Sequence, residues 1–140
     1  MMHVGMNIPD KTALFRGVAR VLGPGAVFGV YDVMQTGHAA VTFPVPWATT
    51  AATSALAGPE DYAAALDAAG FEVRATRDRR DFALDFFERL GARLAAAGGP
   101  PPIGLHLVLG PAAQDKIRNM VAALASGAIA PVEMVAARRT

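Results

Sequence analysis

The chain has 140 residues, enough for a single domain that we expect to span residues 1–140. Its 13 basic and 12 acidic residues nearly cancel, which gives no general attraction to nucleic acid or to an anionic membrane. There are no cysteines, and the three histidines lack a metal-ligand spacing, so neither a disulfide nor a metal site is expected. No apolar run is long enough to span a bilayer and the first residues show no signal-peptide pattern, so we expect a cytoplasmic protein.

The first half of the chain reads as a helix, a strand and a long connection. Residues 10–22 carry apolar side chains at helical spacing, and the turn at residues 23–25 ends this helix. Residues 26–33 are nearly all apolar, which is typical of a strand in a sheet covered on both faces. Residues 35–58 form a connection of a length that is usually either functional or disordered.

The second half continues the alternation of helices and strands. Its expected elements are a helix over residues 59–69, a strand over 71–77, a helix over 81–97, a segment of ambiguous type over 103–109, a helix over 112–126 and a strand over 132–137. This order predicts an α/β fold with a three-stranded mixed sheet covered by helices.

Several segments, taken in order, resemble one protein family. Residues 3–8 are similar to the segment that leaves the fourth strand of class I S-adenosylmethionine-dependent methyltransferases, and residues 20–25 are similar to their turn before the fifth strand. The other matching segments are residues 31–33, 43–48, 68–73, 101–106 and 119–121. The resemblance is to small-molecule members similar to glycine/sarcosine and quinone-type methyltransferases. It covers nearly the whole chain and implies the C-terminal half of a truncated Rossmann-like methyltransferase.

The sequence departs from that family where the cofactor would bind. Family members hold S-adenosylmethionine with a glycine-rich turn after the first strand and an acid after the second, and both lie upstream of every matching segment. The glycine cluster at residues 23–25 follows a helix and precedes a strand, the reverse of such a loop. We therefore expect a parent activity of methyl transfer to a small molecule, with no cofactor bound by this chain alone. Because Met1 corresponds to a position within the family's domain, a truncated gene or a misassigned start is expected.

The resemblance and the strand ends single out five candidate site residues. The resemblance places His3 beside the methyl donor as a catalytic base, although a terminal histidine can also lack a fixed position. Tyr31 and Asp32 end a strand at the edge where α/β proteins bind ligands, while Asp32 could instead cap a turn. Trp47 lies in a proline-framed loop and could line a substrate pocket or plug the core. His106 could bind substrate, although a lone histidine is more often a hydrogen-bonded core residue.

Two apolar surfaces carry further expectations. Phe82, Phe86 and Phe87 have the spacing of a helix face that packs into a core. In the complete family fold the strand at residues 26–33 lies inside the sheet, and here its neighbour is missing. We therefore expect a homodimer through the exposed edge of this strand and the helix at residues 10–22. The alternatives to a methyltransferase are a non-catalytic small-ligand-binding module, which would need more strands in a curved sheet, and a dimerisation module.

Overall fold

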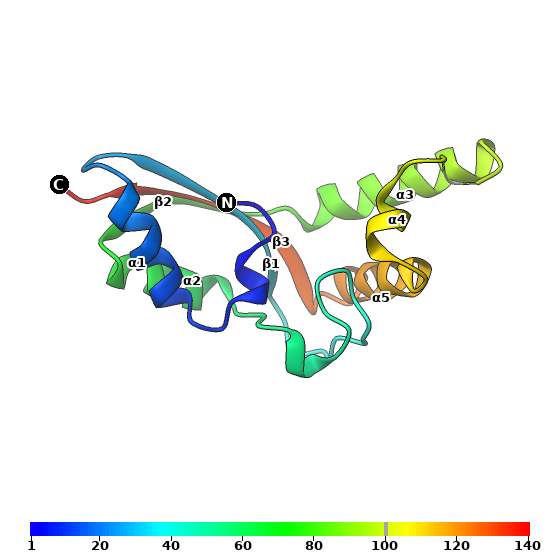
Figure 1. Ribbon diagram of the computed structural model, residues 1–140, viewed down its shortest axis with the longest axis horizontal. Coiled ribbons are helices and arrows are strands. Elements are labelled where there is room, and N and C mark those ends of the chain that lie inside the picture. The colour runs from blue at the N-terminus through cyan, green and yellow to red at the C-terminus, as the bar shows by residue number, and fades with distance from the viewer. Residues whose placement is uncertain (100) are drawn as a thin grey trace.

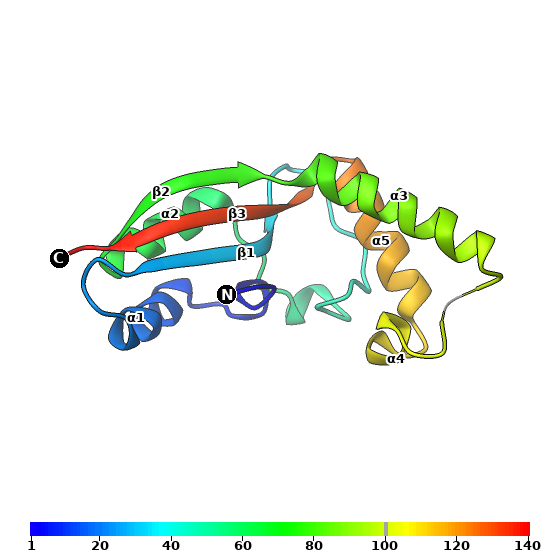
Figure 2. The same ribbon diagram turned by 90° about the horizontal axis from the view of Figure 1, so that it is seen from above.

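The computed structural model describes residues 1–99 and 101–140. Its elements are η1 Gly5–Asn7, α1 Lys11–Val21, β1 Val27–Gln35, η2 Ala51–Thr53, α2 Pro59–Ala68, β2 Phe71–Asp78, α3 Arg80–Ala96, α4 Leu105–Leu109, α5 Ala113–Ala125 and β3 Ile129–Arg138. The expected helices and strands are therefore present, and the ambiguous segment contains α4. The sheet with α1 and α2 forms one end of the molecule, and α3, α4 and α5 form an arm at the other end (Figures 1 and 2).

The sheet is antiparallel, with the strand order β1-β3-β2. The expectation of a mixed sheet is wrong for these three strands. The strands β1 and β2 run in the same direction, as their connection through α2 requires, but β3 lies between them and runs the opposite way. Because β3 separates them, β1 and β2 form no parallel pair.

A proline lies within the central strand, which begins three residues earlier than expected. Pro131 pairs with Val33 of β1, and its carbonyl accepts a hydrogen bond of 2.8 Å from the Arg79 amide. Arg79 follows the last residue of β2, so no β2 residue at this position needs the N–H that proline lacks. Pro131 is therefore tolerated because it lies where one neighbouring strand has already ended.

The main core lies between the sheet and the pair α1 and α2, which cover the same face (Figure 1). Its largest fully buried side chains from these elements are Tyr62, Phe15, Phe71, Met34, Leu66 and Met134. The Asp10 carboxylate caps α1 by accepting a hydrogen bond of 2.8 Å from the Ala13 amide. The opposite face of the sheet is open at the start of β1, where Val27 is 70% exposed. The expectation of a strand covered on both faces is therefore wrong for this end of β1.

The first three residues lie along the outer edge of β1 (Figure 2). Met2 forms a parallel bridge with Tyr31, the Tyr31 amide donates to the Met1 carbonyl at 2.9 Å, and the His3 amide donates to the Tyr31 carbonyl at 2.9 Å. The terminal ammonium donates to the Gly29 carbonyl at 2.8 Å. These residues add a short parallel pairing to the outer edge of β1. The expectation that this edge has no partner is therefore wrong for its centre.

A second core joins the sheet to the arm. It contains Val33, Ala83, Met120, Leu124 and Ile129. The Arg80 guanidinium stabilises this junction through three hydrogen bonds. It donates to Thr36 Oγ1 at 2.6 Å and to the carbonyls of Gly127 and Ile129, both at 3.4 Å. The end of β1, the start of β3 and the start of α3 are thus held together. Among the described residues, no helix has the length and apolar character needed to cross a membrane.

Candidate functional site

A cavity of about 550 Å³ lies where the sheet meets the arm. This volume is in the range of small-molecule sites. Its wall is formed by residues of η1, β1, β3, α3, α4 and α5, together with His3 and the connection between β1 and α2. The wall is mainly apolar, and its polar side chains are His3, Asn7, Tyr31 and Trp47. Three of the five predicted site residues therefore lie in one wall.

His3 has a defined position beside Tyr31. Its backbone amide is bound to the Tyr31 carbonyl, and the two rings meet edge to face with centroids 5.5 Å apart and an interplanar angle of 89°. Its φ of 52° lies in the left-handed region, which histidine adopts more readily than most residues. The edge of β1 thus directs an exposed imidazole into the wall of the cavity.

Tyr31 is half-buried and brings a phenol into the same part of the wall. Burial raises the pKa of the Tyr31 hydroxyl above its ordinary value of 10.0, the Arg79 cation opposes this rise, and the Glu133 carboxylate adds to it. The phenol is therefore protonated at neutral pH and can donate a hydrogen bond to a ligand.

The Trp47 loop is fixed at both ends. The Trp47 indole donates to Ser54 Oγ at 3.0 Å, and Asn119 of α5 donates to the Pro44 carbonyl at 2.9 Å. Trp47 and Pro46 both line the cavity, as expected for this loop. Trp47 also packs against the second core, so the lining and core-filling alternatives apply together.

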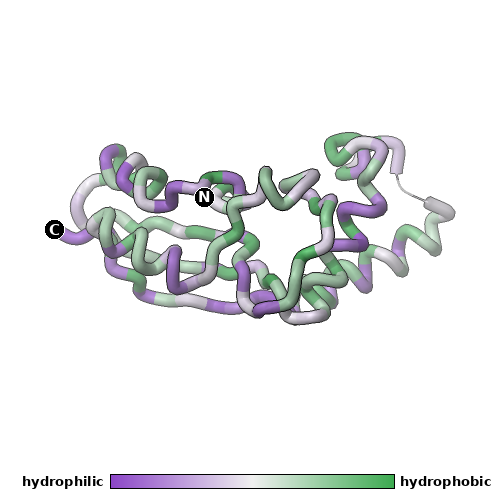
Figure 3. The backbone as a smooth tube through the Cα atoms, turned by 90° about the horizontal axis from the view of Figure 1, so that it is seen from below, coloured by the Kyte–Doolittle hydropathy of each residue, from purple (hydrophilic) through white to green (hydrophobic). Residues whose placement is uncertain are grey.

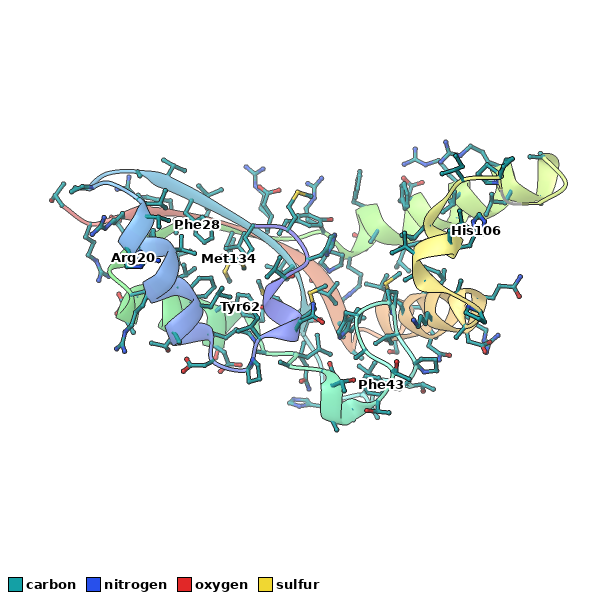
Figure 4. All side chains as sticks on the ribbon, in the orientation of Figure 1. Arg20, Phe28, Phe43, Tyr62, His106 and Met134 are labelled. Atoms are coloured by element: carbon teal, nitrogen blue, oxygen red, sulfur yellow. The ribbon has the colours of Figure 1, made fainter. Side chains whose placement is uncertain are left out.

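Asp32 and His106 are not brought into the wall. Asp32 is fully buried on the opposite face of β1, where its Oδ2 accepts a hydrogen bond of 3.0 Å from the Tyr62 hydroxyl. Burial raises the pKa of Asp32, and the Tyr62 hydrogen bond partly opposes this rise. His106 lies on α4 with its ring against Gly104, while its helix neighbours Leu105 and Leu109 line the cavity. Figure 4 shows His106 on the arm, far from Tyr62.

The phenylalanines of α3 were missed as site residues. The expectation of core packing is wrong for Phe82 and Phe86, which are 52% and 42% exposed and line the cavity, as does the less exposed Phe87. Periodicity identifies an apolar helix face but does not say what the face meets. The available signal was position, because these residues lie in the first turns after β2 ends, at the end of the sheet where β1 also ends.

A buried lysine positions η1 and was also missed. Lys11 donates to the carbonyls of Ile8 and Ala55 at 2.6 and 2.7 Å. Burial lowers the pKa of the Lys11 ammonium, and the carboxylates of Asp32 and Asp61 oppose this change. The ammonium thereby joins the N-terminal segment to the long connection, and both contribute to the cavity wall.

Among the described residues, the glycine cluster at residues 23–25 does not fit a role in holding S-adenosylmethionine at this cavity. The glycine cluster lies at the other end of the sheet from the cavity, where the Gly25 amide donates to the Arg138 carbonyl at 2.9 Å. It connects the end of α1 to the start of β1, so it does not open a helix that could receive a ligand. Among the residues that the structure describes, no three His, Asp or Glu side chains converge as metal ligands.

No protein-family model matches the sequence, and no curated protein matches it. Solved structures do. A sarcosine dimethylglycine methyltransferase from Galdieria sulphuraria aligns with a TM-score of 0.70 at 15% identity over 99% of this chain and 51% of its own. A geranyl diphosphate C-methyltransferase from Streptomyces coelicolor A3(2) aligns at 0.66 and 15% identity over 98% of this chain and 44% of its own. The [4+2]-cyclase SpnF aligns at 0.63 and 21% identity over 99% and 48%.

The chain thus has the fold of part of a class I S-adenosylmethionine-dependent methyltransferase. It spans about half the length of the solved structures that it matches. This coverage is consistent with a C-terminal half. At these identities the likeness concerns the fold, and the function has to be argued from the cavity.

Proposed function

We propose that this chain carries the acceptor side of an S-adenosylmethionine-dependent methyltransferase acting on a small molecule, and that it is inactive alone. The observation that carries the proposal is the cavity wall, in which His3, Tyr31 and Trp47 meet at one end of the sheet. Among the described residues, the glycine cluster at residues 23–25 lies away from this cavity, which supports inactivity of the isolated chain.

The roles of these residues follow from their positions. Methyl transfer requires mainly that the acceptor is aligned and that water is excluded. The Tyr31 phenol orients an acceptor hydroxyl or carbonyl by donating a hydrogen bond. The His3 imidazole removes the proton of an acceptor hydroxyl as that oxygen becomes methylated. Trp47 and the α3 rings hold the body of the acceptor and exclude water.

The test extends the chain by the sequence encoded immediately upstream in the same reading frame. We expect this extended protein to bind S-adenosylmethionine and to transfer a radiolabelled methyl group to an acceptor that the isolated chain also binds. Replacing His3 by Gln should lower the transfer rate by about 100-fold, with unchanged acceptor affinity. An upstream sequence without a glycine-rich turn, or an extended protein that binds the cofactor and acceptor without transfer, would reject the proposal.

A second candidate is small-ligand binding without methyl transfer. The similarity to a [4+2]-cyclase favours it, because the same half-fold occurs in a protein whose described reaction is a cyclisation. A cone-shaped binder with a larger curved sheet is a poorer match to the three strands of the described residues. Ligand binding without any labelled product from the extended protein would favour this second candidate.

A further inference from the structure

We propose that the ligand of the cavity is a neutral, predominantly apolar, ring-containing molecule, and not an amino-acid-like or phosphorylated one. The description of this ligand as a methyl acceptor rests on the proposed function. The binding preference itself rests only on the wall of the cavity.

The cavity wall favours ligands that carry no charge. Among the described residues that line it there is no carboxylate, guanidinium or ammonium group. A carboxylate, ammonium or phosphate placed there would lose its hydration without an ion-pair partner among the lining side chains, which opposes binding. Arg79 is not among the lining residues: its guanidinium carbon lies 4.9 Å from the Phe82 ring centroid, although its charge acts on the Tyr31 hydroxyl. The wall therefore disfavours charged ligands.

Several aromatic rings line the cavity and favour an apolar ligand. Trp47 lines the cavity together with Phe82, Phe86 and Phe87, and the last two meet edge to face with centroids 5.3 Å apart. Large apolar side chains that stay exposed around a concave site are stabilised when an apolar ligand covers them. Rings and rigid cages present much apolar surface with few rotatable bonds, so they lose little entropy in such a site.

The polar and the apolar side chains of the cavity wall come from different elements. His3 and Tyr31 come from the edge of the sheet, whereas α3 and α4 contribute apolar side chains such as Leu105. The Trp47 indole already donates to Ser54. The wall therefore suits a ligand with one polar end, a hydroxyl or a carbonyl, and an apolar body that extends toward the arm. This chemistry differs from the sarcosine, dimethylglycine and geranyl diphosphate in the descriptions of the similar structures.

The experiment compares three ligands that share one apolar cage and differ only in charge: 1-adamantanemethanol, 1-adamantanecarboxylate and 1-adamantanemethylammonium. Trp47 is the sole tryptophan and lies in the wall, so its fluorescence reports binding directly. We expect the neutral alcohol to bind the isolated chain at least ~10-fold more tightly than either ion. Sarcosine should produce no change. Equal binding of an ion and the alcohol would overturn the preference for neutral ligands.

A matched pair of variants on α4 locates the site. Leu105 and Leu107 are 59% and 60% exposed, but only Leu105 lines the cavity. We expect Leu105→Asp to weaken binding of the alcohol by ~10-fold or more, and Leu107→Asp to leave it unchanged. Equal effects of the two variants, or no Trp47 response to any ligand, would overturn the proposal. Because no cofactor is needed, binding can be confirmed even if methyl transfer fails in the extended protein.

Discussion

The hydroxyl of Tyr62 donates a hydrogen bond of 3.0 Å to Oδ2 of Asp32, and neither side chain is exposed. The pair joins α2 to β1 beneath η1. A Cβ atom at Gly5 would lie 2.4 Å from Asp32 Oδ2, so only glycine lets the η1 backbone approach the carboxyl group this closely. Asp32 thus acts behind the cavity wall, by supporting the turn that carries Met6 and Asn7. Figure 4 shows Tyr62 between the helices and the sheet.

The stability of the fold should depend on the ionisation of Asp32. Because burial raises the pKa of Asp32 above its ordinary value of 3.8, the folded state retains a proton at pH values where the unfolded state has lost it. This contribution to the free energy of unfolding is complete below the ordinary pKa and declines as the pH rises toward the raised one. Replacing Asp32 by Asn removes the decline, so the variant should gain stability relative to the wild type as the pH rises.

Urea unfolding at a series of pH values from 4 upward measures this effect. Asp81→Asn is the matched control, because Asp81 is exposed in the first turn of α3. The pH profile of this control gives the baseline for the same substitution at an exposed position. Parallel pH profiles for Asp32→Asn and the wild type would contradict the assignment of a raised pKa to Asp32.

Removing the Tyr62 hydroxyl should destabilise the fold. Tyr62→Phe leaves the buried Asp32 carboxyl without its side-chain donor, which costs about 1–3 kcal/mol in the free energy of unfolding. The cost should grow as the pH rises through the raised pKa of Asp32, since the ionised carboxylate depends more on the donor. Tyr31→Phe is the control for the same chemical change at a half-buried position, and its effect should stay within about 0.5 kcal/mol. Equal losses in both variants would show that the Tyr62–Asp32 hydrogen bond contributes no more to the free energy of unfolding than the Tyr31 hydroxyl does.

The isolated chain should not bind S-adenosylmethionine with useful affinity. Its glycine cluster lies at the far end of the sheet from the cavity and opens no helix there. Isothermal titration calorimetry should give no measurable heat of binding at millimolar cofactor. A dissociation constant in the low micromolar range would be incompatible with this account.

The elements of the fold follow well from local patterns. Apolar spacing and the Asp10 cap place α1, and Pro59 at the first turn places α2 close to where the sequence predicts them. The position of β3 between the other strands does not follow, because strand pairing joins residues from about 55 to about 110 positions apart and periodicity contains no information on such partners. The mixed sheet was therefore predicted where an antiparallel one forms.

The site was predictable in part. The resemblance singled out His3, the end of a strand singled out Tyr31, and the loop after that strand singled out Trp47. All three residues line the same cavity wall. Asp32 follows Tyr31 directly in a strand, so its side chain points to the opposite face. That alternation, applied to the sequence, would have separated the two residues. The α3 phenylalanines show the reverse case, because the same helical spacing serves either a core or a cavity.

A homodimer remains our proposal for the surface around α1 and β1. Val21 and Val27 are largely exposed at the neighbouring ends of these elements, and Met2 is exposed on the segment that follows the β1 edge. Since Met1–His3 already pairs with the centre of that edge, a second copy could add backbone hydrogen bonds only beyond it. Burying the apolar side chains would then supply most of the stabilisation.

Sedimentation equilibrium at micromolar concentration should therefore give twice the mass of the chain, with each partner burying roughly 800 Å² or more. Val27→Lys should dissociate the dimer, because a charged side chain at a strand edge opposes pairing and loses its hydration in an apolar contact. Ile103→Lys is the control, since Ile103 is an equally apolar and highly exposed residue near α4, on the arm that Figure 3 shows to be hydrophobic at α4. A monomeric wild type would refute the dimer. Dissociation by the arm variant but not by Val27→Lys would place the interface on the arm instead of on β1.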